Sequence, residues 1–180
     1  MSKAGRLTPF SYVILALVGR DGAGPHDIVR MMREGAIFWT TSESHYYAEP
    51  RRLATLGFLQ ARTEPGRTRP RTHYELTDTG REALTAWLAE PAAMPRMQNE
   101  GVVKLLAADF SHDTTIAASL AGLRVGIQRA YQDLEEMERR ALQIPHRTRY
   151  LRLIDDYARR SLDAQSEWLD AVQEELGRQQ

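Results

Sequence analysis

The sequence of 180 residues contains no cysteine, so disulfide bonds, thiolate metal ligands and a cysteine nucleophile are excluded. It also has no long hydrophobic segment: the longest apolar run, residues 12–18, is far too short to span a bilayer. A helix start at Thr8 and Pro9 precedes this run and no small-residue cleavage site follows it, so a signal peptide is not expected. These absences predict a cytoplasmic protein without a membrane partner.

The chain has no excess of charge of either sign, because 24 lysines and arginines balance 24 aspartates and glutamates. A protein without net charge is not drawn as a whole to nucleic acid, so any electrostatic function must be local. Between residues 51 and 71, six arginines accompany a single acid, Glu64, which gives this stretch a net charge of plus five. The rest of the chain is acidic by the same amount, and the sequence therefore predicts one concentrated basic patch.

Patterns typical of enzymes are missing as well. The five histidines are scattered, and the sequence has no H-E-x-x-H, Walker A or G-x-G-x-x-G motif. Ser111, His112 and Asp113 contain the letters of a catalytic triad, but triads are assembled in space, and this run is typical of a helix N-cap. We therefore expect neither an enzyme nor a metal site, and no cofactor.

Local signals divide residues 1–90 into four helices and one hairpin. Helices are predicted over residues 9–18, 26–34, 43–56 and 78–90, the third with an interruption or bend at Pro50. Two short segments, residues 58–63 and 71–76, flank the turn sequence Glu64-Pro65-Gly66 and predict a β-hairpin. Three helices, a hairpin and a fourth helix are the order of a winged helix-turn-helix, so the fold is expected to be mainly α with a small β-hairpin.

Residues 91–180 predict a second, α-helical domain. After a helix over residues 98–109, apolar residues recur at alternating steps of four and three from Ile116 to Ala141, and a last helix over residues 148–176 carries two apolar stripes. Such stripes favour a coiled-coil-like dimerisation domain, whereas the alternative is a monomer whose helices fold back on the first domain. The predicted dimer interface comprises Ile116, Leu120, Leu123, Ile127, Leu134, Leu162, Leu169 and Val172.

The basic patch coincides with the two elements that a winged helix presents to DNA. The second helix of the motif enters the major groove with its N-terminal residues at the base edges, and a basic hairpin beside it suits the flanking phosphates. Short polar side chains and arginines supply these contacts, although a run of arginines on a loop is often only a solvated turn. The candidates for binding DNA are Thr41, Ser42, Ser44, His45, Arg51, Arg52, Arg67, Arg69 and Arg71.

These residues resemble the PadR family of bacterial transcriptional regulators. The resemblance covers residues 8–88, and the helical second half is similar in shape and position to the C-terminal dimerisation domain of the longer members. The matching segments are Phe38-Trp39, Ser42-Glu43-Ser44, Tyr47, Arg51-Arg52-Leu53, Leu56-Gly57-Phe58-Leu59, Tyr74-Glu75-Leu76-Thr77 and Gly80-Arg81-Glu82-Ala83-Leu84.

The resemblance implies a homodimeric repressor in the bacterial cytoplasm that binds a double-stranded operator and is released by a small molecule. It adds Tyr47 to the candidates for binding DNA, although a tyrosine at this place also suits core packing. A planar aromatic effector would fit a pocket lined by Tyr131, Tyr150, Tyr157 and Trp168, while plain packing is the alternative for these rings. The operator, the effector and the choice between repressor and activator stay open. A different function on the same scaffold is a protein–protein adaptor that does not bind DNA.

Overall fold

The computed structural model describes residues 7–35, 38–39, 41–65, 70–95 and 97–178. The chain divides into two compact units, residues 1–94 and 95–180, each of which is described by itself. The division falls after Met94, a few residues beyond the boundary that the sequence predicts. No described helix is both long enough and apolar enough to cross a membrane.

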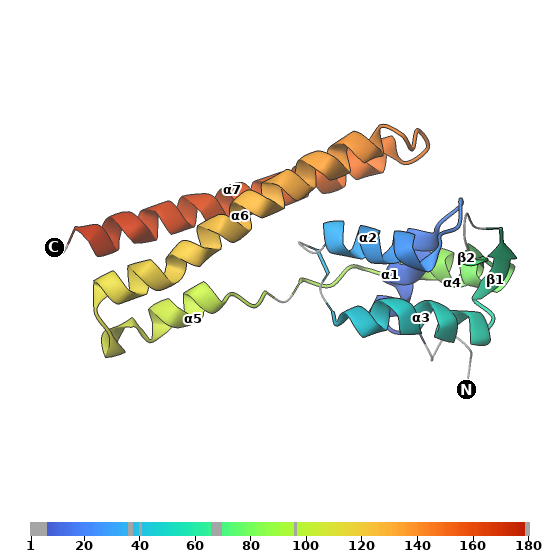
Figure 1. Ribbon diagram of the computed structural model, residues 1–180, viewed down its shortest axis with the longest axis horizontal. Helices are drawn as coiled ribbons and strands as arrows, with labels where there is room; N and C mark the ends of the chain where they lie inside the picture. Colours follow the sequence, from blue (N-terminus) through green and yellow to red (C-terminus); the bar gives the residue numbers. More distant parts are fainter. Residues whose placement is uncertain (1–6, 36–37, 40, 66–69, 96, 179–180) are drawn as a thin grey trace. The chain divides into compact units, whose positions relative to one another are not determined.

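The amino-terminal unit has the predicted order of elements, and the prediction of a mainly helical fold with a small hairpin is confirmed (Figure 1). Its last helix ends at Leu88 rather than at Glu90. The elements are α1 (Pro9–Val18), α2 (Pro25–Glu34), α3 (Glu43–Thr55), β1 (Leu59–Glu64), β2 (Arg71–Leu76) and α4 (Asp78–Leu88).

Helix α1 begins where the sequence places its start. The Thr8 hydroxyl accepts a hydrogen bond from the Ser11 backbone N–H, and the Ser11 hydroxyl accepts one from the Thr8 backbone N–H. This reciprocal cap satisfies two backbone donors that the first turn leaves open, and Pro9 is preset for the first helical position. The apolar face of α1 then buries Ile14 and Leu15 completely.

Helix α3 continues through Pro50, so the predicted interruption at this residue is wrong. Tyr46, Pro50 and Leu53 recur at steps of four and three, and all three side chains are buried. A proline inside a helix removes one backbone hydrogen bond and costs about 3 kcal/mol. The burial of the proline ring in the core offsets this cost, because it lies on the same inward face as its two apolar neighbours.

The hairpin pairs β1 and β2 in antiparallel register, from Leu59 opposite Leu76 to Glu64 opposite Arg71. Two hydrogen bonds of 3.0 and 2.9 Å between the backbones of Ala23 and Tyr74 join β2 to the connection between α1 and α2. The hairpin is therefore fixed to the unit through the middle of β2. The part of the predicted turn from Gly66 onward, with Arg67 and Arg69, lies outside the described residues.

The junction between the hairpin and α4 depends on Gly80. A Cβ atom at this position would lie 2.1 Å from the carbonyl oxygen of Phe58, a distance that a larger residue cannot accommodate without movement of the backbone. Beside it, the Thr77 hydroxyl donates to the carbonyl of Gly57 at 2.7 Å and caps α4 through the Gly80 N–H. This close approach explains why a glycine begins the Gly80-Arg81-Glu82 segment.

The carboxy-terminal unit is a helical hairpin preceded by two short helices. It consists of α5 (Glu100–Leu106), a single 3₁₀ turn (Ala108–Phe110), α6 (Asp113–Ala141) and α7 (Thr148–Gly177). The first of these is shorter than the predicted helix over residues 98–109. The connection of six residues between α6 and α7 makes the two long helices antiparallel neighbours, which lie side by side in Figure 1.

The apolar seam of α6 closes against α7 of the same chain. Three of the predicted interface residues, Ile116, Leu120 and Leu169, form a buried cluster, and Leu134 and Leu162 are also buried. The heptad pattern is satisfied within one chain, so these side chains leave little surface for a second one. The other three predicted residues, Leu123, Ile127 and Val172, pack partly buried against the same cluster. Their contact with a second subunit stays a prediction.

Candidate nucleic-acid interface

Helix α3 has one buried face and one exposed face. The buried face is formed by Tyr46, Pro50 and Leu53, which anchor the helix on the core. The opposite face is open to solvent along the whole helix, and its small and polar side chains allow a close approach to the floor of a DNA groove. The residues on this face are Ser44, Ala48, Arg51 and Thr55.

Two members of this face, Ala48 and Thr55, are absent from the prediction. Both lie at helical spacing from Ser44 and Arg51, and this periodicity is the signal that would have found them. The methyl groups of alanine and threonine contact the methyl group of thymine in DNA complexes. The exposed face therefore extends beyond the polar N-terminal turn on which the prediction concentrates.

The first turn of α3 brings together four of the predicted residues. The Nδ1 atom of His45 lies 2.7 Å from the Ser42 hydroxyl and 3.2 Å from the Thr41 hydroxyl. The Ser42 hydroxyl is in turn 3.0 Å from that of Ser44. Hydroxyls and a neutral imidazole both donate and accept hydrogen bonds, so this polar cluster can exchange its internal bonds for bonds to base edges or phosphates.

Arg52 takes part in a hydrogen-bond network within the amino-terminal unit. Its guanidinium donates to both carboxylate oxygens of Glu49, at 2.8 and 2.7 Å, and to the Ser11 hydroxyl at 3.0 Å. The Ser11 hydroxyl donates to Glu49 at 2.7 Å and is completely buried. This network joins α3 to α1, so Arg52 helps to position the helix, and its contact with DNA stays a prediction.

The Glu49 carboxylate is stabilised in its ionised form by this network. Burial opposes ionisation and is the largest single influence, but hydrogen bonds from Arg52 and Ser11 and the charge of Arg52 outweigh it and lower the pKa of Glu49. A carboxylate whose pKa is lowered on folding stabilises the folded state above its unfolded pKa. This contribution is lost as the pH falls through the folded pKa, below the ordinary value of 4.5.

Glu49→Gln is therefore expected to lower the free energy of unfolding by about 1–2 kcal/mol at neutral pH, because charged hydrogen bonds become neutral ones. Urea unfolding of parent and variant at pH 7 and pH 3 measures this difference, which should shrink at the acidic pH. Glu82→Gln, on an exposed position of α4, is the matched control and should change little at either pH. A difference in the free energy of unfolding between the parent and Glu49→Gln that is the same at both pH values would contradict the assignment.

The described part of the hairpin carries its arginines in ion pairs across the two strands. Arg62 lies 3.0 Å from Glu75, and Arg71 lies 3.3 Å from Glu64. Both arginines are largely exposed, so these pairs are weak and their guanidinium groups can turn to phosphates instead. Arg51, in contrast, forms no ion pair with any residue that the structure describes. The net charge of the basic patch in space is therefore lower than the plus five counted along the sequence.

The remaining predicted residues are not brought into one place. Tyr47 is half-buried and packs against the core of its unit, away from the exposed face of α3. Trp168 packs against the cluster around Leu120, and the Tyr131 hydroxyl donates to Asp163 at 2.5 Å, which raises the pKa of Tyr131 to about 12.

Tyr150 and Tyr157 are exposed near the start of α7, and Tyr150 lies about 27 Å along the helix from Trp168. Within one chain the four rings lie in separate surroundings, and a ligand pocket that they line together stays a prediction.

Comparisons with known proteins agree with this geometry. Residues 14–86 match the model of the transcriptional regulator PadR-like family. The amino-terminal unit belongs to this family. Residues 97–177 match a second model, described as the C-terminal region of virulence activator alpha. The PadR-like unit and the helical hairpin are thus each similar to regulatory proteins, in agreement with the expectation that the chain is not an enzyme.

Among individual proteins, the chain is 31% identical over 86 residues to the negative transcriptional regulator PadR of Bacillus subtilis (strain 168). This match spans 47% of each protein, so about half the length of that relative is covered. The structure resembles Bacillus subtilis PadR in complex with operator DNA, with a TM-score of 0.77 and 21% identity over 94% of this chain and 98% of the other. Bacillus subtilis PadR in complex with p-coumaric acid gives a TM-score of 0.66 and 20% identity over 93% and 98%.

Proposed function

We propose that this PadR-like regulator is a homodimeric repressor that binds a double-stranded DNA operator. The observation that supports this function most directly is the exposed face of α3, with a polar cluster at its first turn and Arg51 behind it. The fold of the PadR-like unit is that of a protein solved with operator DNA. The relative that matches this unit is named a negative transcriptional regulator, which favours a repressor over an activator.

In this proposal the contacts with DNA divide by chemistry. Ser44 and His45, near the start of α3, enter the major groove and read base edges. Arg51 and the hairpin arginines Arg67, Arg69 and Arg71 bind phosphates, because guanidinium groups form paired hydrogen bonds with phosphate oxygens. The phosphate contacts set the position of the helix, and the base contacts set the sequence that it prefers.

The proposed dimer uses apolar side chains that the single chain leaves exposed. Because the seam between α6 and α7 is filled within the single chain, the proposed interface uses the outer surface of the carboxy-terminal unit. Exposed apolar patches of this kind mark protein–protein contacts, and a second copy of the chain is the partner that a repressor of this type requires. The side chains are Val102, Val103, Leu106 and Phe110 on the short helices and Tyr150, Leu153, Ile154 and Tyr157 on α7.

Release by a small molecule completes the proposed function. Bacillus subtilis PadR has been solved with p-coumaric acid as well as with operator DNA, which supports an effector that weakens DNA binding here too. Such an effector acts by binding the DNA-free conformation more tightly than the DNA-bound one.

The experiment that tests this function is retardation and footprinting of the DNA upstream of the gene for this protein. A repressor should retard this DNA with an affinity that falls steeply with salt, and should protect two symmetrically related half-sites. A protein–protein adaptor on the same scaffold would give no symmetric protection and would be indifferent to competing phosphate polymers. That outcome would overturn the proposal in favour of the adaptor.

A further inference from the structure

An ion pair crosses the turn between α2 and α3. The guanidinium of Arg33, in the last turn of α2, donates to the carboxylate of Glu43, in the first turn of α3, at 2.7 Å. Both side chains are largely exposed, with 66% of Arg33 and 55% of Glu43 open to solvent. Glu43 lies between Ser42 and Ser44, whose hydroxyls belong to the polar cluster at the start of α3. The Arg33 guanidinium is therefore held beside the turn that is proposed to read base edges.

This ion pair can be exchanged for another at little cost. A pair of exposed side chains contributes little to stability, because water competes for both charges. Each partner also has a favourable place without the other, since a cation in the last turn of a helix and an anion in the first turn both interact well with the helix dipole. A guanidinium forms two parallel hydrogen bonds with a phosphate, which are stronger than one exposed contact of this kind. A phosphate within reach would therefore take Arg33 from Glu43.

The other arginine of α2 is arranged differently. Arg30, one turn earlier, pairs with Asp27 at 2.9 Å and lies 3.9 Å from Glu34, and both partners belong to α2 itself. Arg33 is the arginine of α2 whose partner belongs to α3. In a helix-turn-helix the first helix of the motif crosses the DNA backbone while the second lies in the groove. An arginine that joins the two helices is thus placed where the backbone borders the groove.

We propose that Arg33 is a further phosphate-binding residue and that Glu43 competes with the DNA backbone for it. In the free protein Glu43 holds the guanidinium at the edge of α3, and on binding a phosphate replaces the carboxylate. This inference rests on the proposed binding of α3 to operator DNA. Because phosphate contacts carry no sequence information, Arg33 should affect the affinity for all sequences alike.

The alternative is a structural clamp, in which the pair only fixes the angle between α2 and α3. The two roles predict opposite effects for Glu43→Gln. The loss of a competitor tightens DNA binding, whereas the loss of a clamp weakens it.

The test measures binding of the full chain to a fluorescently labelled duplex of the DNA upstream of its gene, by anisotropy at a series of salt concentrations. Arg33→Ala should reduce the slope of log affinity against log salt by about 0.9 for each subunit, whereas Arg33→Lys should keep the slope. Glu43→Gln should tighten binding about twofold to fivefold for each subunit, because the competitor is lost. The parent's slope in Arg33→Ala, or weaker binding by Glu43→Gln, would overturn the proposal.

The double variant with Arg33→Ala and Glu43→Gln separates competition from general repulsion between Glu43 and DNA. Without Arg33 there is no guanidinium for Glu43 to hold, so Glu43→Gln should then change the affinity less than about twofold. An equal gain with and without Arg33 would show that Glu43 only repels phosphates, and the competition would be refuted.

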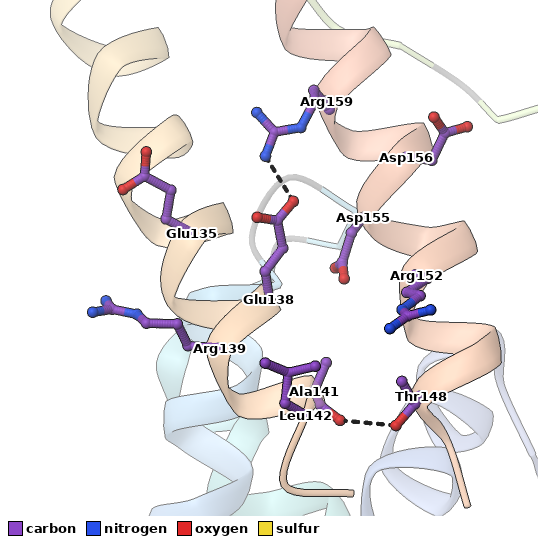
Figure 2. A pocket seen from close by; sticks show the side chains of 10 residues that line it. All are labelled: Glu135, Glu138, Arg139, Ala141, Leu142, Thr148, Arg152, Asp155, Asp156 and Arg159. Atoms are coloured by element: carbon purple, nitrogen blue, oxygen red, sulfur yellow. Dashed lines mark hydrogen bonds and ion pairs between the residues drawn. The ribbon is translucent and has the colours of Figure 1, made fainter. Parts of the chain in front are cut away.

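A matched ion pair lies in the carboxy-terminal unit. Arg159 of α7 donates to Glu138 of α6 at 2.6 Å, and the dashed line in Figure 2 marks this bond beside the hollow that both side chains line. This pair also joins two helices and is partly exposed, but both partners are far along the sequence from α3. Arg159→Ala and Glu138→Gln should therefore keep the slope and affinity of the parent. If they reproduce the effects of the Arg33 and Glu43 variants, those effects belong to total charge and the proposal is wrong.

The same titrations separate this inference from the proposed function. A parent protein that binds no duplex DNA at any salt concentration would overturn both. A parent that binds with a steep salt dependence, together with an Arg33→Ala variant of equal slope, would overturn only the role of Arg33.

Discussion

Replacement of Arg67, Arg69 and Arg71 together with alanine is expected to flatten the salt dependence of operator binding. Each phosphate that a protein neutralises contributes about 0.9 to the slope of log affinity against log salt. If all three arginines of both subunits bind phosphates, the slope falls by up to about 5. Because phosphates carry no sequence information, the variant should lose affinity for all sequences alike. Gel retardation at a series of salt concentrations measures the slope directly.

The matched control removes the same charge from the other unit. Arg129, Arg149 and Arg160 are exposed on α6 and α7, and their joint replacement with alanine should keep the slope of the parent protein. The account of the hairpin requires that the two triple variants differ. If both have the parent's slope, the hairpin arginines do not bind phosphates; if both flatten it equally, the effect belongs to total charge.

Leu120→Asp and Leu153→Asp are expected to fail in different ways, although both place a charge on an apolar residue of the carboxy-terminal unit. Leu120 is 1% exposed and lies between α6 and α7, so an aspartate there should destabilise the unit by at least about 3 kcal/mol and unfold it. Leu153 is 64% exposed on α7, so its replacement should preserve the fold and yield monomers. Circular dichroism and analytical ultracentrifugation separate the two outcomes.

The pair of leucine variants also decides where the subunits meet. If Leu120→Asp yields a folded monomer, the subunits meet at the α6 seam and not at the exposed side chains of α7. A Leu153→Asp protein that sediments as a dimer with the affinity of the parent would remove the exposed stripe of α7 from the interface. Leu153→Ala serves as the mild control, because it shortens the side chain without adding a charge.

Much of the fold could be predicted because its signals are local. Thr8 and Pro9 start a helix by their own cap, and Thr77 does so again before α4. The turn sequence between residues 63 and 71 predicts the hairpin, and the structure pairs its strands from Leu59 opposite Leu76 to Glu64 opposite Arg71. Pro50 is the exception, because the cost of a proline inside a helix is local whereas the packing that offsets it is not.

The parts that could not be predicted depend on which element lies next to which. A heptad pattern requires a partner helix but does not say whether that helix belongs to the same chain, and here α7 fills the seam of α6. The charge of the basic patch was counted along the chain, whereas Glu49 and Glu75, just outside the counted stretch, pair with Arg52 and Arg62 in space.

The difference between Arg51 and Arg52 is an intermediate case. The spacing of Tyr46, Pro50 and Leu53 defines the buried face of α3, and Arg51 lies opposite that face while Arg52 lies at its edge. Helical periodicity alone could therefore have separated the exposed arginine from the one that contacts α1. The partner that holds Arg52, the Ser11 hydroxyl, is 41 residues away and is visible only in the structure.

The selection of binding sites from random DNA duplexes tests the role of α3 most directly, with the parent protein and with Ser44→Ala and His45→Ala. The parent should enrich an inverted repeat whose half-sites are one helical turn, about 34–36 Å, or a multiple of it apart. Each variant should keep this spacing and lose preference at particular base pairs, by about 1–3 kcal/mol for each contact removed. A parent that enriches no sequence, or variants that keep every base preference, would contradict the assignment of α3 as the helix that reads DNA.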